Sequence, residues 1–218
     1  MDLLNLNTSI YDKIVIIPAL IVAFTVHEFA HAFVADKLGD KTPRFQGRVT
    51  LNPAAHLDPI GFILAVFFIF GWAKPVQTNP SAYKNPSKDS LKVSLAGPIS
   101  NFIVAIIATV IYALFIKVFY FKLSEGVAQV LHDMIFYILS VNISIGLFNL
   151  IPVPPLDGFK IIKYFKPRIF YEFQDKFYQY QPLILIALIL FGGRIIGIFS
   201  TAILNFLLRL VSVVLHVF

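Results

Sequence analysis

The amino-acid sequence predicts an all-α polytopic membrane protein, with a core of three transmembrane helices and a further hydrophobic region at the C-terminal end. Two compositional values carry this prediction: of the 218 residues, 58% are hydrophobic and only 14% are charged. Soluble domains carry about 25% charged residues. The mean hydropathy of +0.79 agrees, and much of the chain is therefore expected to face lipid.

Three long apolar segments are expected to form the core, and each is long enough to cross a hydrocarbon layer of about 30 Å. They are residues 14–35, 93–116 and 134–151. A further apolar stretch begins at Leu183 and is interrupted by Gly192-Gly193-Arg194. Because a straight span would bury Arg194, a kinked span, a short hairpin and an interfacial helix all stay open for residues 183–216.

Two shorter segments are expected to associate with the membrane without crossing it. The run Ile60–Phe70 has 11 residues between Pro59 and Gly71, a length typical of re-entrant or interfacial pieces. Over Phe45–Leu51, apolar and polar residues alternate, which predicts a short strand or β-hairpin. Such a hairpin could offer an edge to an extended peptide or could simply cover a neighbouring site.

The charges and the missing cysteines exclude several classes of site. No cysteine is present, which excludes disulfides, thiolate metal sites and cysteine nucleophiles. The net charge of +6 could suggest a nucleic acid partner. In so apolar a chain, basic loops beside membrane spans explain the excess better, and we expect a lipid bilayer and no nucleic acid as partner.

A polar cluster, His27-Glu28-Phe29-Ala30-His31, lies within the first long apolar segment. His27 and His31 are four residues apart, so both imidazoles share one helix face and can hold one zinc ion. Glu28 lies beside them and can take a proton from a water on that ion. An acidic residue at the centre of a span costs about 2.5–3.5 kcal/mol, which favours a functional cluster over a buried polar patch.

A catalytic zinc site needs a third protein ligand, because three side chains plus water complete its coordination. The candidates elsewhere in the chain are His56, Asp58, His132, Asp133, Asp157 and His216. Asp157 follows a stretch with three prolines, which forbid a regular helix, and broken backbone at a membrane boundary is typical of a cavity wall. On spacing alone, Asp157 is equally well explained as the cap of the next helix.

Several motifs together carry a family resemblance. The chain resembles the site-2 protease family of intramembrane zinc metalloproteases, in a compact branch without a PDZ or CBS domain. The motifs, which span about residues 24–158, are His27-Glu28-x-x-His31, Gly47-Arg48-Val49-Thr50-Leu51-Asn52-Pro53, Gly71-Trp72-Ala73-Lys74-Pro75-Val76, Gly97-Pro98-x-x-Asn101 and Asn149-x-x-Pro152-x-Pro154-x-Leu156-Asp157-Gly158.

The resemblance implies a ligand set and a general base. It implies that His27, His31 and Asp157 bind one zinc ion and that Glu28 activates the water. It further implies that Asn149 holds the scissile peptide or its oxyanion, that Pro152 shapes the same wall, and that Asn101 belongs to the substrate-binding part of the site.

Charge and topology give a test that does not depend on the resemblance. If residues 60–70 do not span, the two following segments form a hairpin and Asp157 returns to the side on which the first segment ends. Thirteen basic residues between 37 and 176 then lie on that side, and only Lys13, Lys117 and Lys122 lie on the other. The positive-inside rule therefore places the site toward the cytoplasm, with His27 about 9 Å below the membrane edge.

The expected protein is thus a single membrane-embedded protease domain over residues 1–218, with its core at 14–165 and its C-terminal membrane segment or segments at 183–216. We expect a multi-pass protein of the plasma membrane that hydrolyses peptide bonds in or near the transmembrane segments of membrane-protein substrates. The alternative is a non-proteolytic zinc-binding scaffold that holds client helices. The sequence leaves substrate identity and oligomeric state open.

Overall fold

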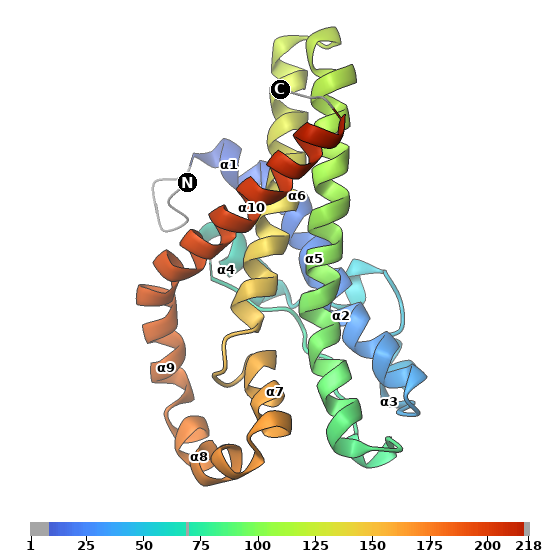
Figure 1. Ribbon diagram of the computed structural model, residues 1–218, viewed down its shortest axis with the longest axis vertical. Helices are drawn as coiled ribbons and strands as arrows, with labels where there is room; N and C mark the ends of the chain where they lie inside the picture. Colours follow the sequence, from blue (N-terminus) through green and yellow to red (C-terminus); the bar gives the residue numbers. More distant parts are fainter. Residues whose placement is uncertain (1–8, 69, 216–218) are drawn as a thin grey trace.

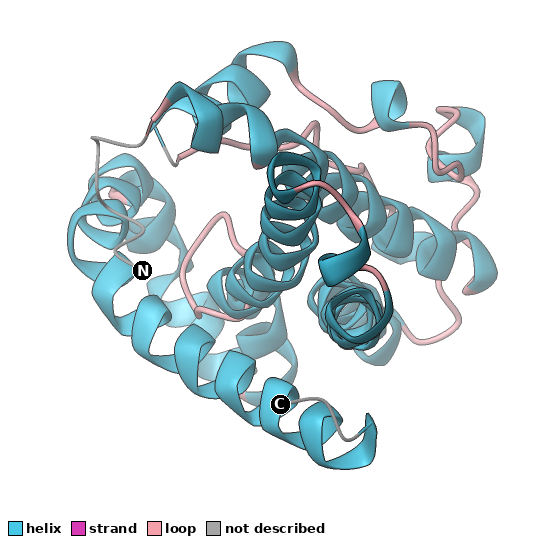
Figure 2. Cartoon of the chain, turned by 90° about the horizontal axis from the view of Figure 1, so that it is seen from above, coloured by secondary structure: helices cyan, strands magenta, loops and turns pink. Residues whose placement is uncertain are grey.

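The computed structural model describes residues 9–68 and 70–215, and within these ranges the chain consists of helices and loops (Figure 2). The long helices are α2 (Ile17–Lys37), α5 (Pro86–Val118), α6 (Glu125–Asn149) and α10 (Gly193–Leu215). The shorter ones are α1 (Ile10–Val15), α3 (Thr42–Phe45), α4 (Pro59–Phe68), α7 (Asp157–Phe165), α8 (Pro167–Gln179) and α9 (Gln181–Ala187). Short 3-10 turns are η1 (Pro53–Ala55), η2 (Pro80–Ala82) and η3 (Tyr120–Lys122), and a π-helical turn, η4 (Leu188–Gly192), joins α9 to α10.

Four stretches of helix among the described residues are long and apolar enough to cross a membrane. They are Ile10–Lys37, Pro86–Val118, Glu125–Asn149 and Gln181–Val214. This pattern makes the chain an all-α polytopic membrane protein, as the composition predicts. The break expected at Gly192-Gly193 is the π-helical turn followed by a change of direction between α9 and α10 (Figure 1).

The helices α2, α5 and α6 pack against one another, and α10 lies across α5 and α6 (Figure 1). Small residues make these approaches close: Ala19 and Ala23 of α2 pack against α6. Ala105 and Ala108 of α5 meet Leu139 and Ile143 of α6 in the same way, and leucines of α10 cover that cluster. Between spanning helices, where water-driven association is absent, such close backbone approach is what dispersion packing requires.

The expected β-hairpin over Phe45–Leu51 is wrong: the described residues contain no strand there, and α3 ends at Phe45. Pro43 starts a helical turn, and Gly47 follows with a left-handed φ of 66°. Arg48 then donates its backbone N–H to the Pro43 carbonyl, 2.8 Å away, which closes a turn. Arg48 is buried while Phe45 and Leu51 are exposed, so the alternation of apolar and polar residues here is not that of a half-buried strand. Among the described residues, an isolated β-bridge pairs Leu57 with Ala73.

The topology brings distant parts of the sequence to one end of the molecule. Helix α4 has ten residues, about 15 Å of helix, and is too short to span. Helices α5 and α6 are joined by η3 at the upper end of Figure 1, so α6 returns the chain to the end where α2 finishes. Asn85 caps the start of α5, since its side chain accepts from the Lys88 N–H. This return is the arrangement that the charge distribution favours.

The cysteine-free chain allows a direct test of this topology. Single cysteines placed at the exposed positions Lys41 and Lys84 flank α4 and should react with a membrane-impermeant thiol reagent from the same side. Lys122→Cys, in η3, should react only from the opposite side. Labelling of Lys41→Cys and Lys84→Cys from opposite sides would contradict a non-spanning α4.

Candidate metal centre

The two histidines of the His27-Glu28-x-x-His31 motif meet Asp157 in the interior of the protein. Helix α2 carries the histidines, and Asp157 is the first residue of α7. The two Nε2 atoms lie 3.0 Å apart, and Asp157 Oδ2 lies 3.2 Å from His27 Nε2 and 3.0 Å from His31 Nε2. All three side chains are buried. Three ligand atoms from two distant segments therefore point at one small volume.

The chemistry of these atoms fits a cation between them. Both Nδ1 atoms face an oxygen at 2.7 Å, so the neutral form of each ring carries its proton on Nδ1 and directs the Nε2 lone pair inward. Asp157 Oδ2 is buried and has no hydrogen-bond donor. Three inward electron pairs without a proton repel one another unless a cation lies between them. Zinc bonds of 2.0–2.1 Å put tetrahedral ligand atoms about 3.3 Å apart, close to the separations here.

Gly97 of α5 leaves the space that such a cation needs. A Cβ built at Gly97 would lie 2.5 Å from His31 Nε2 and 2.6 Å from His27 Nε2. Any larger side chain would therefore push into the ligand atoms themselves. Glycine at this position is explained by the cradle around the metal, because the helix backbone alone does not require it.

A chain of amides behind His27 fixes the orientation of its ring. Asn101 Oδ1 accepts from His27 Nδ1 at 2.7 Å, while Asn101 Nδ2 donates to the Ala23 carbonyl at 3.1 Å and to Asn142 Oδ1 at 2.9 Å. Asn142 in turn donates to the Ile138 carbonyl. Both asparagines are fully buried, and each hydrogen bond fixes the direction of the next. His31 is held by the Val93 carbonyl. Such partners orient metal ligands and set their tautomer.

The segment between α6 and α7 carries Asp157 back to the histidines. Asn149 ends α6, and the irregular stretch that follows contains the three prolines noted in the sequence. Gly158 lets this stretch fold tightly, since a Cβ there would collide with the backbone carbonyls of Leu150 and Ile151. Lys160, one turn into α7, donates to Asp157 Oδ1 at 3.2 Å and leaves Oδ2 for the metal site.

Glu28 lies beside the ligand cluster and is held from the other side by the loop after α4. Its Oε2 accepts the Val76 backbone N–H at 2.8 Å. Arg48 Nη2 lies 4.0 Å from the same oxygen and also donates to the Lys74 carbonyl. Burial lowers the pKa of the Arg48 guanidinium, and the nearby Glu28 carboxylate offsets only part of this shift. Both side chains are buried. The contacts from Val76 and Arg48 are both made to Oε2, and neither involves Oε1.

A cavity of about 290 Å³ opens onto the cluster. Its lining includes His27, Glu28, His31 and Asp157, with Asn149 and Pro155 from the segment after α6 and Pro75 and Val76 from the loop after α4. Tyr83 also lines it, and burial raises the pKa of this phenol to about 12. The basic residues Lys160 and Lys163 also line the cavity, and both are exposed.

The structure sorts the residues predicted from the sequence. His27, Glu28, His31, Asp157 and Asn149 all line one cavity. Asn101, expected on the substrate side, lies behind His27 and is fully buried. Pro152 is exposed and is not part of the described lining, where Pro155 takes that place.

The other candidates for third ligand lie elsewhere. His56 Nε2 contacts the Thr50 carbonyl, Asp58 caps α4 through Gly61, and His132 pairs with Asp133 at 2.9 Å on α6. His216 lies outside the described residues. Within the described chain, the grouping of His, Asp and Glu side chains able to hold a metal is His27, His31 and Asp157.

Sequence reasoning missed four contributors to this site. Gly97 stands in a quoted motif, but its role depends on how close α5 approaches α2. Asn142 carries no motif and is recognisable only as a polar residue inside an apolar segment. Arg48 could have been noticed as a cation in the predicted membrane-associated region. Val76 also stands in a quoted motif, but its contribution comes from the backbone N–H and depends on where the loop after α4 lies.

The sequence matches Peptidase family M50 over residues 15–192. The chain belongs to this family. It is 44% identical over 144 residues to "Putative zinc metalloprotease YwhC" of Bacillus subtilis, an alignment that covers 66% of this chain and 65% of that relative. It is 27% identical over 154 residues to "Putative zinc metalloprotease Rip2" of Mycolicibacterium smegmatis, covering 67% and 55%. The Rip2 protein of Mycobacterium tuberculosis is 28% identical over 158 residues, covering 69% and 56%.

The chain spans less than two thirds of the length of these curated relatives. No solved structure gives a significant match. The names of these relatives include zinc, and two imidazoles with a carboxylate are a known catalytic ligand combination for that metal.

Substitution of Gly97 tests the metal cradle. Gly97→Ala should abolish stoichiometric zinc binding, because the new methyl group would occupy the space beside both Nε2 atoms. Alanine favours helix over glycine by about 1 kcal/mol, so the loss would not come from a weaker helix. Metal content of the purified protein measures this. Gly126→Ala, where a Cβ meets nothing within 4 Å, is the matched control and should keep its zinc. Full zinc content in Gly97→Ala would refute the cradle.

Substitution of Asn101 tests the support behind His27. Asn101→Leu removes the acceptor for the Nδ1 proton, and zinc affinity should fall about 10–100-fold, the usual cost of losing such a partner. Competition with a chromophoric chelator measures the affinity, and the melting temperature in excess zinc reports the fold. An unchanged zinc affinity in a folded Asn101→Leu variant would contradict a role of Asn101 in orienting His27.

Proposed function

We propose that this protein is an intramembrane zinc endopeptidase that hydrolyses peptide bonds in or near the transmembrane segments of membrane-protein substrates. The observation that carries the proposal is the position of Glu28. It lies on a helix long enough to span a membrane, beside a buried cluster of three side chains able to hold a metal. Membership of a peptidase family supports it. A scaffold that only bound zinc would gain nothing from an acidic residue held in this position.

One zinc ion is the cofactor we assign to His27, His31 and Asp157. When bound there, zinc supplies Lewis-acid activation of a water and of the substrate carbonyl. The two histidines and the aspartate contribute a fixed geometry, because every one of them is oriented by a neighbour: Asn101, the Val93 carbonyl and Lys160 respectively. The ligands therefore need little rearrangement when the ion binds.

Glu28 is the residue that we assign as general base. It accepts a proton from the attacking water and delivers it to the nitrogen of the leaving amine as the peptide bond breaks. The Val76 N–H holds Oε2 of this carboxylate, Glu28 lines the cavity, and we assign the proton transfer to Oε1. Arg48 Nη2 lies 4.0 Å from that held oxygen and bounds the carboxylate on the side away from the ligand cluster.

The substrate binds, on this account, along the cavity wall that carries Asn149. The Asn149 Nδ2 group donates to the Ile145 carbonyl at 3.0 Å, which fixes the amide and presents its remaining polar atoms near the cavity. There it can hold the scissile peptide or its oxyanion. A helix conceals its carbonyls in its own hydrogen bonds, so a transmembrane substrate has to unwind locally before cleavage.

We further assign the site to the cytoplasmic side of the plasma membrane. The basic residues that follow α2 and α6 support this orientation through the positive-inside rule. Helices α2, α5 and α6 serve as the three-helix core around zinc, and residues 1–218 act as one protease domain. His27 then lies about a third of the way into the hydrocarbon layer, where water can still enter.

Cleavage of a model transmembrane substrate by the purified protein in proteoliposomes tests the function. Cleavage should occur, a zinc chelator should stop it, and added zinc should restore it. Glu28→Gln should keep one zinc per chain and lose at least about 100-fold in rate, the low end of a general base's contribution. Asp157→Asn should lose both its zinc and its cleavage activity. Rapid cleavage by Glu28→Gln would contradict its assignment, and binding of the substrate without cleavage by the wild type would favour the scaffold.

A further inference from the structure

Helices α7 and α8 form an amphipathic unit at the lower end of the molecule, directly after the metal ligand Asp157 (Figure 1). We use the name α7–α8 unit for residues 158–180. Its inner face is a cluster of rings: Phe159 packs against Phe170, Phe177 and Tyr178, with ring centroids 4.8, 5.4 and 5.8 Å apart. Phe159 is 2% exposed, so this cluster ties the two helices into one body.

The outer face of the α7–α8 unit carries large apolar side chains that the described chain does not cover. Phe165, Ile169 and Phe173 are 63%, 49% and 40% exposed. Their spacing of four residues places Ile169 and Phe173 on one face of α8. Phe165 is the last residue of α7. A soluble surface rarely presents such a run of apolar residues without a partner.

The same unit is strongly basic. Between residues 158 and 180 it carries five basic residues against two acidic ones, Glu172 and Asp175. The basic residues are Lys160, Lys163, Lys166, Arg168 and Lys176. Lys166, Arg168 and Lys176 are all exposed. Lys163 lies over the Phe170 and Tyr171 rings, with its Nζ 5.6 Å from each centroid, so this cation is held against the aromatic cluster.

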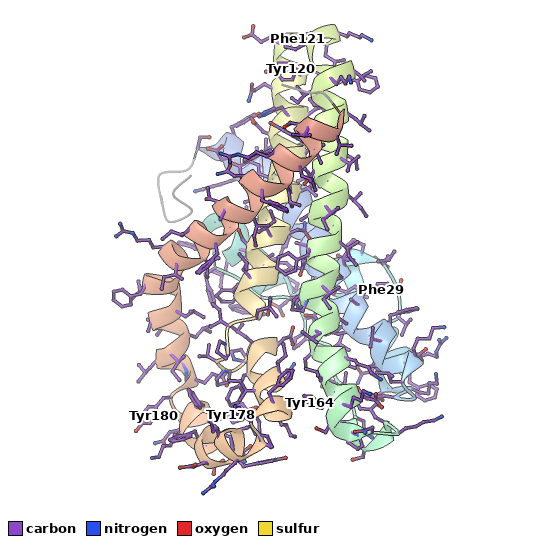
Figure 3. The ribbon with its side chains drawn as sticks, viewed as in Figure 1. Phe29, Tyr120, Phe121, Tyr164, Tyr178 and Tyr180 are labelled. Atoms are coloured by element: carbon purple, nitrogen blue, oxygen red, sulfur yellow. The ribbon has the colours of Figure 1, made fainter. Side chains whose placement is uncertain are left out.

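The position of the unit indicates which partner can cover it. The helix α6 ends just before it, and α9, the start of the last spanning stretch, begins at Gln181 directly after it. Both of its ends are therefore tied to segments long enough to span. Figure 3 shows Tyr164, Tyr178 and Tyr180 gathered at this end, opposite Tyr120 and Phe121 at the other. Tyrosines at both ends of a bundle are typical of the two membrane–water interfaces.

We propose that the α7–α8 unit is a binding surface for anionic lipid headgroups, and that this binding holds Asp157 in place against the histidines. Phe165, Ile169 and Phe173 enter the boundary of the acyl chains, while Lys166, Arg168 and Lys176 contact headgroup phosphates. Asp157 is the first residue of α7, so the depth of the unit in the bilayer sets the position of the carboxylate. Lipid charge thereby becomes a determinant of metal affinity.

The cysteine-free chain allows the binding to be measured without any activity. Phe173→Cys, labelled with an environment-sensitive fluorophore, is reconstituted at full length in nanodiscs of phosphatidylcholine with or without phosphatidylglycerol. Phosphatidylglycerol should shift the emission to the blue and increase quenching by brominated acyl chains. Lys84→Cys, exposed at the same end but outside the unit, is the control and should respond much less.

A charge variant separates headgroup binding from general attraction to an anionic bilayer. Lys166→Gln/Arg168→Gln should lose most of the response to phosphatidylglycerol, since each basic contact contributes about fivefold to membrane affinity. Lys84→Gln/Lys88→Gln removes the same charge from the η2–α5 region and should retain the response. If free inorganic phosphate in a neutral bilayer reproduces the shift, the lipid assignment is overturned. A fluorophore that stays in water in both bilayers overturns it as well and leaves the face for a protein partner.

Zinc retention supplies the second half of the test. In phosphatidylglycerol nanodiscs the wild type should hold zinc against a chelator more tightly than in neutral ones, and the Lys166→Gln/Arg168→Gln variant should lose that difference. Equal zinc retention in both bilayers would contradict the proposed effect of lipid charge on the position of Asp157. Only an effect of lipid on cleavage would rest on the proposed function: a protein that responds to phosphatidylglycerol but never cleaves would refute the function and leave this inference standing.

Discussion

The structure depends on the convergence of three potential ligand atoms, His27 Nε2, His31 Nε2 and Asp157 Oδ2, within 3.2 Å of one another in a buried place. Burying such a set is unfavourable unless a cation neutralises it, because desolvation and mutual repulsion act together. The surrounding residues make sense only with that cation. Gly97 leaves the room, Asn101 and the Val93 carbonyl take the Nδ1 protons, and Lys160 takes the second oxygen of Asp157.

The same constraint explains the topology. Asp157 lies 126 positions after His31 in the chain, and only a short α4 followed by the α5–α6 hairpin returns it to the end of α2. The proline-containing stretch after α6 and the tight fold at Gly158 then turn the backbone inward. The loop after α4 completes the cavity from the opposite side through Val76 and Arg48. Segments from distant parts of the sequence thus meet at one polar cluster inside an apolar bundle.

Much of this could be predicted from the sequence, for identifiable reasons. The histidines and Glu28 form a local pattern on one helix, so their spacing alone predicts that both imidazoles share one helix face beside Glu28. The length of the 60–70 run and the charge distribution predict the return of Asp157, although spacing alone could not choose between a ligand and a cap. The β-hairpin was wrong because alternation over 45–51 does not reveal the left-handed turn at Gly47. The position of Asn101 behind His27 depends on how α5 packs against α2, which no local pattern contains.

Zinc K-edge X-ray absorption of the purified protein tests the central claim most directly. The account predicts one zinc per chain, with two imidazole nitrogens and carboxylate or water oxygens at about 2.0–2.2 Å, the bond lengths of a catalytic site. In Asp157→Asn the zinc should be lost or its oxygen shell altered, while the imidazole signature of any remaining zinc stays. Zinc bound with the same stoichiometry and the same shell in wild type and Asp157→Asn would contradict the three-ligand centre on which everything else depends.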